Sequence, residues 1–234
     1  RHQDELLFPI ASPKPQKQDP YPFANKWIGS HLKITKEFFR CKGNPSNPPI
    51  KILNKELQPH YYLDCGGIEG HSLPLKEGKE FIYPILIDLL NYVQEKAEKK
   101  VIITSGHRCP IHNVYVTSST GMQCSKHLIG AEVNFYVKGL EHEPEKVVSL
   151  LMNYFQEKSG NQSFSRSAKP DLDAHTPAWF NQEILIKLYR AEEGRNGDNQ
   201  HSYPYLSLQV RYDKETKRGV SYSWHQAYNG YLKN

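Results

Sequence analysis

Residues 125–137, Ser-Lys-His-Leu-Ile-Gly-Ala-Glu-Val-Asn-Phe-Tyr-Val, decide the fold class. From 131 to 137, apolar side chains alternate with polar ones, which is typical of a β-strand with one buried face and one polar face. Amphipathic helices are predicted on both sides of this strand, at 80–99 and 144–157. The regular part of the first helix should begin near Pro84, because helices accept proline in their first turn.

The rest of the chain consists mainly of short strands and polar loops. A short helix is predicted at 34–40, and polar loops are predicted at 108–126 and 160–178. Strands are predicted at 50–53, 60–63, 101–104, 183–190, 205–212 and 220–227. Two helices followed mainly by antiparallel strands indicate an α+β fold, with a mainly antiparallel sheet packed by two main helices.

The N-terminal 33 residues have a different composition from the rest. Five prolines occur among the first 22 residues, at positions 9, 13, 15, 20 and 22. Such a segment is typical of an arm or linker rather than a packed element. We therefore expect a proline-rich arm over 1–33 and a single domain over 34–234.

The composition excludes several classes of partner. The 234 residues carry a formal charge of +5, and the basic residues are scattered, so we expect no nucleic-acid binding. The longest apolar run, 81–93, contains Asp88 and Asn91 and is too short to cross a bilayer, so we expect no membrane span. With 12% aromatic residues the chain is not expected to be disordered.

Four cysteines, at positions 41, 65, 109 and 124, permit two disulfides. Cys109 and Cys124 flank one short segment, so we predict that they pair, which leaves Cys41 to pair with Cys65. In a reducing cytosol all four would instead be buried thiols. The disulfide interpretation favours a periplasmic or secreted protein whose signal peptide has been removed.

Two histidines, His127 and His225, could ligate a metal. Catalytic zinc takes three protein ligands and keeps one position open for water. His127 precedes the strand at 131–137, position 134 lies on that strand's polar face, and a strand ending at His225 could bring a further ligand alongside. Alternatively, Cys109-x-x-His112 and Cys124-x-x-His127 could form a structural Cys₂His₂ zinc site.

Other polar residues near these histidines have two interpretations each. Arg108 is either a surface arginine or a guanidinium that holds a carbonyl, carboxylate or developing oxyanion. Ser125 is either a turn residue or a hydrogen-bond partner for a peptide. We interpret His107 and His112 as loop residues. A Ser-His-Asp arrangement, a P-loop and a dinucleotide fingerprint are all missing from the sequence.

Three segments together resemble the zinc D-Ala-D-Ala carboxypeptidases of the VanY and VanX type, which have the LAS metallopeptidase fold. The family patterns are Ser-Gly-Tyr-Arg, Ser-x-His-x-x-Gly-x-x-x-Asp and Glu-x-Trp-His-x-x-Tyr-x-Gly. This chain has Ser105-Gly106-His107-Arg108, Ser125-x-His127-x-x-Gly130-x-x-x-Asn134 and Tyr222-x-Trp224-His225-x-x-Tyr228-x-Gly230. The order and spacing of all three patterns are kept, and the resemblance covers about residues 34–234.

The resemblance implies removal of the terminal D-alanine from peptidoglycan stem peptides, with zinc held by His, Asp and His and a glutamate acting as base. It assigns the metal positions to His127, Asn134 and His225, and the base position to Tyr222. It also implies that the substrate is bound by Arg108, Ser125 and Trp224.

Two departures from the family pattern fall on the reaction centre. Asn134 replaces the aspartate ligand, and a neutral amide donates less charge to zinc than a carboxylate does. Tyr222 replaces the glutamate, and a tyrosine with a pKa of about 10 is a poor base near neutral pH. We therefore expect a degenerate site with zinc binding weakened or lost. This predicts a cell-envelope pseudoenzyme that binds peptidoglycan peptides ending in D-Ala.

Two alternatives remain. Glu132 lies two residues before Asn134, on the same face of a strand, and could replace the missing ligand or base in an active zinc peptidase. Otherwise Glu132 is a solvated strand residue, which is the interpretation that we favour. The second alternative is a non-catalytic interaction or signalling module with a protein partner, by analogy with the signalling domain of hedgehog proteins, which shares this fold.

Overall fold

The centre of the computed structural model is a six-stranded sheet, and the structure describes residues 27–53, 56–117, 124–158, 160, 162–170 and 174–233. All the strand pairs of this sheet are antiparallel. In spatial order its strands are β7 (Val101–Ser105), β8 (Glu132–Val137), β12 (Tyr205–Val210), β11 (Ile184–Tyr189), β10 (Trp179–Phe180) and β9 (Ser165–Arg166).

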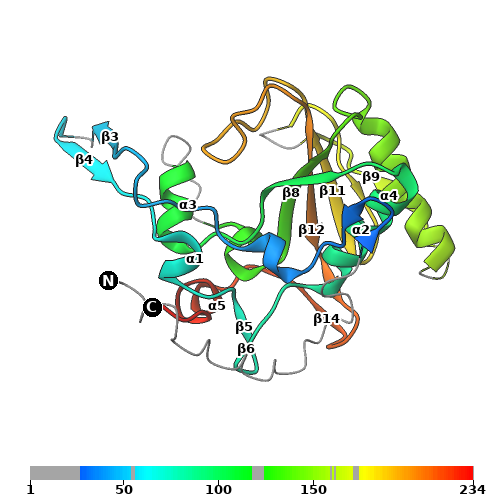
Figure 1. Ribbon diagram of the computed structural model, residues 1–234, viewed down its shortest axis with the longest axis horizontal. Helices are drawn as coiled ribbons and strands as arrows, with labels where there is room; N and C mark the ends of the chain where they lie inside the picture. The colour runs from blue at the N-terminus through cyan, green and yellow to red at the C-terminus, as the bar shows by residue number, and fades with distance from the viewer. Residues whose placement is uncertain are drawn as a thin grey trace, which may run out of the picture.

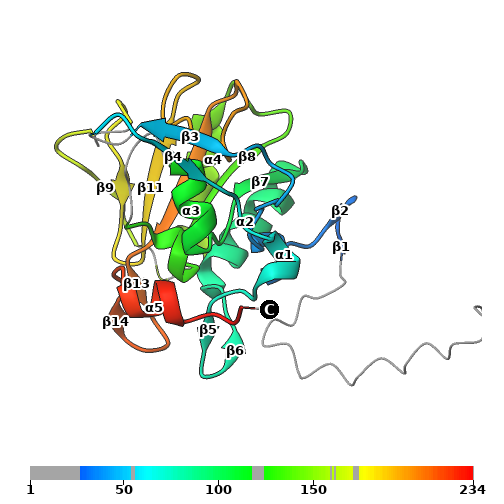
Figure 2. The ribbon, with the colours of Figure 1, turned by 90° about the vertical axis from the view of Figure 1, so that its left-hand side faces the viewer.

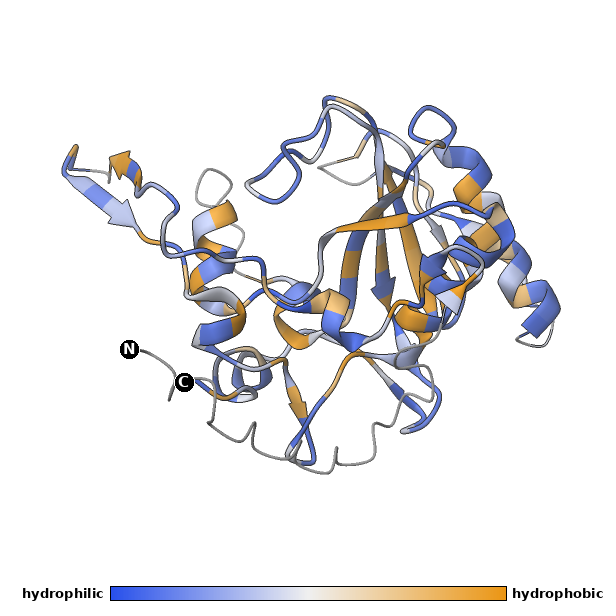
Figure 3. Ribbon diagram, viewed as in Figure 1, coloured by the Kyte–Doolittle hydropathy of each residue, from blue (hydrophilic) through white to orange (hydrophobic). Residues whose placement is uncertain are grey.

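Helices α2 (Pro84–Ala97) and α4 (Pro144–Lys158) cover one face of this sheet. On β8, Val133, Phe135 and Val137 belong to the core that includes both helices. Figure 3 shows apolar and polar residues alternating along the strands of this sheet. The predicted α+β architecture with two main helices is thus confirmed. Within the described part of the chain, no helix is long and apolar enough to cross a bilayer.

The opposite side of the sheet carries α3 (Pro110–Thr117), so the sheet lies between α3 and the pair α2 and α4 (Figure 1). Near one end of the sheet, η3 (Lys126–Ile129) packs against α5 (Trp224–Asn229). This side receives the polar side chains of β8, which include Glu132 and Asn134. It is therefore the side on which a polar site can form.

Short elements surround this central body. Four two-stranded pairs are β1 (Trp27–Ile28) with β2 (His31–Leu32), β3 (Ile50–Leu53) with β4 (Pro59–Tyr62), β5 (Leu75–Lys76) with β6 (Lys79–Glu80), and β13 (Tyr212–Asp213) with β14 (Arg218–Gly219). Near them lie η2 (Lys36–Phe39) and α1 (Gly67–Gly70). Figure 2 shows β1 and β2 on the opposite side of the molecule from β9, and β5 and β6 near α5.

The predicted N-terminal arm lies mostly outside the described residues, which begin at Trp27. The part of the arm that the structure describes, residues 27–33, contacts the domain. The Gln94 side chain on α2 donates a hydrogen bond to the Leu32 carbonyl (2.9 Å). Asn91 Oδ1 accepts one from the Ile34 N–H (2.8 Å). Residues 27–34 therefore run along α2.

Two predicted elements are wrong. The predicted loop at 108–126 contains α3, which begins at Pro110 and buries polar side chains such as His112 and Asn113, so apolar periodicity could not reveal it. The run at 220–227 is not a strand, because α5 begins at Trp224. Ser223 caps α5 by accepting a hydrogen bond from the Gln226 N–H (3.4 Å), and this local cap overrides the alternating pattern.

Candidate functional site

The short helix η3 places His127 beside the start of β8. Ser125 precedes the helix, and its hydroxyl accepts a hydrogen bond from the His127 N–H (3.2 Å). Gly130 ends the helix with a φ of +68°, a left-handed conformation that favours glycine. The serine and glycine of the second motif therefore act locally, as the cap and the turn that position His127.

Gly106 sets the orientation of the His127 ring. Its carbonyl accepts a hydrogen bond from His127 Nδ1–H (2.6 Å), which leaves the Nε2 lone pair for another partner. Gly106 also packs closely on Phe39, and a Cβ at position 106 would lie 2.6 Å from the Phe39 Cα. A larger residue would push this segment away and move the carbonyl that holds His127.

A pocket of about 360 Å³ opens on the polar side of the sheet. Six of the residues predicted for the site line it, and they come from three distant parts of the sequence: Arg108, Ser125, His127, Glu132, Asn134 and Tyr222. His225 does not line it and is exposed on α5. Trp224 is 61% exposed and stacks on Tyr228, with ring centroids 4.9 Å apart. The ligand set of His127, Asn134 and His225 stays a prediction.

Glu132 is buried, with 8% of its surface exposed, so the expected solvated strand residue is wrong. Its Oε1 accepts hydrogen bonds from Ser207 Oγ (2.8 Å) and Gln209 Nε2 (2.9 Å). Burial alone would raise the pKa of Glu132, but nearby His127 and these two hydrogen bonds outweigh it and lower the pKa. Burial also lowers the pKa of His127. Near neutral pH the pocket therefore holds a carboxylate beside a neutral imidazole.

Two polar atoms of the pocket residues are buried and have no hydrogen-bond partner among the described residues. They are Arg108 Nη2, a donor, and Asn134 Oδ1, an acceptor. Buried polar atoms are seldom left unpaired, because each costs about 1–3 kcal/mol. This pair is therefore the strongest indication that the pocket takes a polar ligand.

Sequence reasoning missed the residues that hold Arg108 in place. Asp198 Oδ2 accepts hydrogen bonds from Arg108 Nε (2.7 Å) and Ser105 Oγ (2.7 Å). Asp198 Oδ1 lies 3.0 Å from His112 Nε2, and His112 Nδ1 lies 2.6 Å from Asp64 Oδ1. Burial lowers the pKa of His112, but the two carboxylates outweigh this and raise it. A protonated His112 then donates to both aspartates, so it is not the loop residue that we expected.

Tyr222, at the position of the family's base, is half-buried at the pocket. Burial is the main cause that raises its pKa above the ordinary value. Near neutral pH its hydroxyl keeps its proton and can donate a hydrogen bond, but it is not suited to accept a proton from water.

The pocket residues include the types of ligand that zinc accepts, although the set differs from the family's. Zinc accepts nitrogen and oxygen ligands, and the pocket offers the free Nε2 of His127, the Glu132 carboxylate and the unpaired Asn134 Oδ1. His127 Nε2 lies 3.7 Å from Glu132 Oε1. When bound, zinc would polarise a substrate carbonyl and lower the pKa of a bound water.

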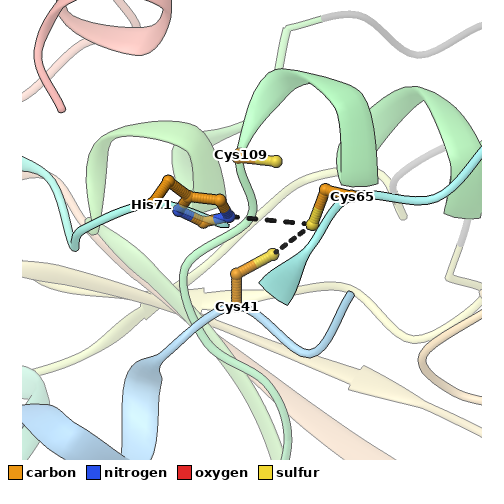
Figure 4. A group of neighbouring side chains, drawn as sticks. All are labelled: Cys41, Cys65, His71 and Cys109. Carbon is orange, nitrogen blue, oxygen red and sulfur yellow. Dashed lines mark hydrogen bonds between the residues drawn. The ribbon is translucent and has the colours of Figure 1, made fainter. Parts of the chain in front are cut away.

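The predicted disulfides are wrong. All four cysteines are free, and the sulfur atoms of Cys41 and Cys65 are 3.7 Å apart, against about 2.05 Å for a disulfide. Cys109 lies with these two and with His71 (Figure 4). Cys124 lies outside this group and is exposed. Three chain segments that are distant in the sequence meet at this point. The fold therefore determines which cysteines lie together, and their spacing along the chain does not.

The Cys₂His₂ alternative is not formed either. Cys109 lies in the cluster with Cys41, Cys65 and His71, while His112 contacts Asp64 and Asp198. Neither Cys124 nor His127 belongs to a group of three or more metal-binding side chains found in the described residues.

Residues 66–168 match the family model of Peptidase M15. The family resemblance is confirmed. Peptidase M15 includes the zinc D-Ala-D-Ala carboxypeptidases of the VanY type, so the match supports a peptidase-like function related to peptidoglycan. The matched range contains Arg108, His127 and Asn134 but ends before Tyr222 and His225. No curated protein and no solved structure gives a significant match to the chain.

Proposed function

We propose that the pocket binds the D-Ala-terminated end of a peptidoglycan stem peptide without hydrolysing it. The observation that carries this proposal is the unpaired donor Arg108 Nη2 in the same pocket as the unpaired acceptor Asn134 Oδ1. A guanidinium N–H suits a carbonyl or carboxylate oxygen, and an amide oxygen suits a peptide N–H.

The charge of the pocket supports a ligand with a terminal carboxylate. Arg108, Lys126 and Lys187 line it together with the single carboxylate of Glu132. Because the pocket is partly enclosed by protein, these cations act on a bound anion more strongly than they would in open water. The free carboxylate of a stem peptide ending in D-Ala is such an anion.

The chemistry of the pocket argues against efficient hydrolysis. Tyr222 holds its proton near neutral pH, and Asn134 contributes no negative charge to a metal. Loss of a positioned general base typically lowers a rate by about 10²–10⁴-fold. The protein is therefore a binding member of a peptidase family. Because its ligand is a component of the cell wall, we also propose that it acts at the bacterial cell envelope, in the periplasm or outside the cell.

Calorimetric titration with a diacetylated L-Lys-D-Ala-D-Ala peptide tests this proposal. Arg108→Lys keeps a cation beside Asp198 but removes the free second nitrogen, so its affinity should fall about tenfold or more. Arg166→Lys is the matched control, because Arg166 is exposed and lies over the Trp179 ring, outside the pocket. Equal affinity of both variants and the wild type would refute the proposal.

A second candidate function is zinc-dependent hydrolysis in which Glu132 replaces the family's aspartate ligand or its glutamate base. It is favoured by one observation, the 3.7 Å separation between Glu132 Oε1 and His127 Nε2. If this candidate holds, zinc-loaded protein releases D-alanine, and Glu132→Gln abolishes the release. A Glu132→Gln variant as active as the wild type would exclude this role of Glu132.

A further inference from the structure

A second group of potential ligands lies outside the pocket, where three loops meet. Cys41 follows η2, Cys65 and His71 flank α1, and Cys109 immediately precedes α3. All four residues are buried, with 1–6% of their surface exposed. One ligand atom from each lies within 4.8 Å of the others. Figure 4 shows the four side chains pointing toward one another.

The measured separations match the edges of a zinc tetrahedron. With Zn–S bonds of about 2.3 Å and tetrahedral angles, two sulfur ligands lie about 3.8 Å apart, and a sulfur and a nitrogen lie about 3.6 Å apart. Here the sulfur atoms of Cys41 and Cys65 are 3.7 Å apart. Cys65 Sγ and His71 Nε2 are also 3.7 Å apart. Both values exceed a disulfide bond by far, yet they suit ligands around one ion.

The surrounding backbone prepares these side chains to bind a cation. His71 Nδ1–H donates a hydrogen bond to the Ser72 carbonyl (2.9 Å), which leaves the Nε2 lone pair directed to the sulfur atoms. The Gly67 N–H donates to Cys65 Sγ (3.2 Å), and the His112 N–H donates to Cys109 Sγ (3.4 Å). Such N–H groups stabilise the negative charge of a thiolate, which is the form that ligates metal.

We propose that Cys41, Cys65, Cys109 and His71 bind one structural zinc ion. Three thiolates and one imidazole in a closed tetrahedron are a Cys₃His set, typical of structural rather than catalytic zinc. This site is separate from the pocket that contains Arg108 and His127, and it does not depend on the proposed function. The neighbouring group of Asp64, Cys65 and His112 is less suited, because Asp64 Oδ1 already accepts hydrogen bonds from the Cys65 N–H and His112.

The zinc ion would link three segments that are distant in the sequence. The ligands come from residues 41, 65–71 and 109, and Tyr231 near the C-terminus packs on them, with its ring 5.5 Å from that of His71. Binding energy of structural zinc contributes directly to folding, because the unfolded chain has no preformed site. Removing zinc should therefore destabilise the loops that carry these residues.

The first test is the metal content of the full chain, purified under reducing conditions and loaded with zinc. We expect one tightly held zinc per chain that is released on titration with an organomercurial thiol reagent. Replacement by cobalt should give the sulfur-to-metal charge-transfer absorption of thiolate ligands. A pocket zinc bound by His127 and oxygen ligands would give no such absorption, so the two sites are distinguishable.

Variants assign the ligands. Cys65→Ser and His71→Ala should lose the thiolate absorption and the tightly held zinc, whereas Cys124→Ser should keep both, because Cys124 is exposed and outside the cluster. His71→Cys converts the set to Cys₄ and should still bind zinc, which separates loss of a ligand from a failure to fold. His127→Ala should leave this zinc in place.

Three results would overturn the proposal. The first is the absence of thiolate–cobalt absorption in folded wild-type protein. The second is retention of the tightly held zinc by folded Cys65→Ser. The third is a disulfide between two of the clustered cysteines in the wild type that was purified under reducing conditions and exposed to zinc, seen as a mass loss of two hydrogen atoms.

Discussion

Arg108 Nε donates a hydrogen bond to Asp198 Oδ2 across 2.7 Å and thereby joins two residues that are 90 positions apart in the sequence. Both side chains are almost completely buried. Asp198 also contacts His112 and Ser105, so it fixes the segment that carries Arg108. The arginine is thus fixed through Nε, while its Nη2 stays unpaired for a ligand.

The Asp198→Asn substitution should destabilise the fold. It leaves Arg108 and a protonated His112 without their shared counter-charge, and breaking a buried ion pair costs about 3–5 kcal/mol. Chemical denaturation measures this change. Glu145→Gln is the control, because its ion pair with Arg190 is exposed and should be worth about 0–1 kcal/mol. Equal losses in the two variants would contradict the role given to Asp198.

His112 should make stability fall as the pH rises. Its pKa is raised in the folded protein by Asp198 and Asp64 despite burial, and the ordinary value is about 6.5. A raised folded pKa contributes stability that is complete below the unfolded pKa and is lost as the pH passes the folded pKa. We expect His112→Gln to remove this decline when denaturation is measured from pH 5 to about 9. Identical pH profiles for both proteins would show that His112 is not protonated between the aspartates.

Gly106→Ala should lower both stability and ligand affinity. The added Cβ would lie 2.6 Å from the Phe39 backbone, and relieving such overpacking costs about 1–3 kcal/mol. The Gly106 carbonyl that orients His127 would also move. Gly70→Ala is the matched control, because its Cβ would meet nothing within 4 Å. Thermal unfolding should therefore separate the variants, and a neutral Gly106→Ala would disprove the close packing.

Restoring the family's residues tests why hydrolysis is expected to be lost. Asn134→Asp with Tyr222→Glu supplies a charged ligand and a carboxylate base, so zinc affinity should rise and D-alanine release should increase by about 10²–10⁴-fold. Asn134→Asp alone should improve zinc binding without the full gain in rate. If the double variant binds zinc tightly but stays inactive, the geometry of Tyr222 or His225 does not correspond to the family's site.

The central sheet and its two helices were predictable because the apolar residues of each element recur at the regular spacing of a strand or a helix. The alternation in β8 and the helical spacing in α2 and α4 are local patterns that burial enforces. In contrast, α3 buries a polar face that includes His112, and α5 depends on the Ser223 cap. Neither signal is hydrophobic periodicity, so the sequence indicated a loop at α3 and a strand at α5.

The candidate site was predictable only where its residues lie in motifs. Arg108, His127 and Asn134 keep the family's spacing, and the structure brings them to one pocket. Asp198 has no such pattern, because its partner Arg108 is distant in sequence and sheet topology brings the two together. The grouping of the cysteines was missed for the same reason. The predicted partner of Cys109 was chosen because it is near in the sequence, whereas its actual neighbours are distant.

Titration of the zinc-exposed wild-type protein with diacetylated L-Lys-D-Ala-D-Ala tests whether the pocket binds stem peptides without hydrolysing them, when D-alanine is measured in the same samples. We expect saturable binding, weaker binding of the L-Ala-L-Ala peptide, and no release of D-alanine above the rate without protein. Absence of binding, or release of D-alanine that a chelator stops, would refute the proposed function.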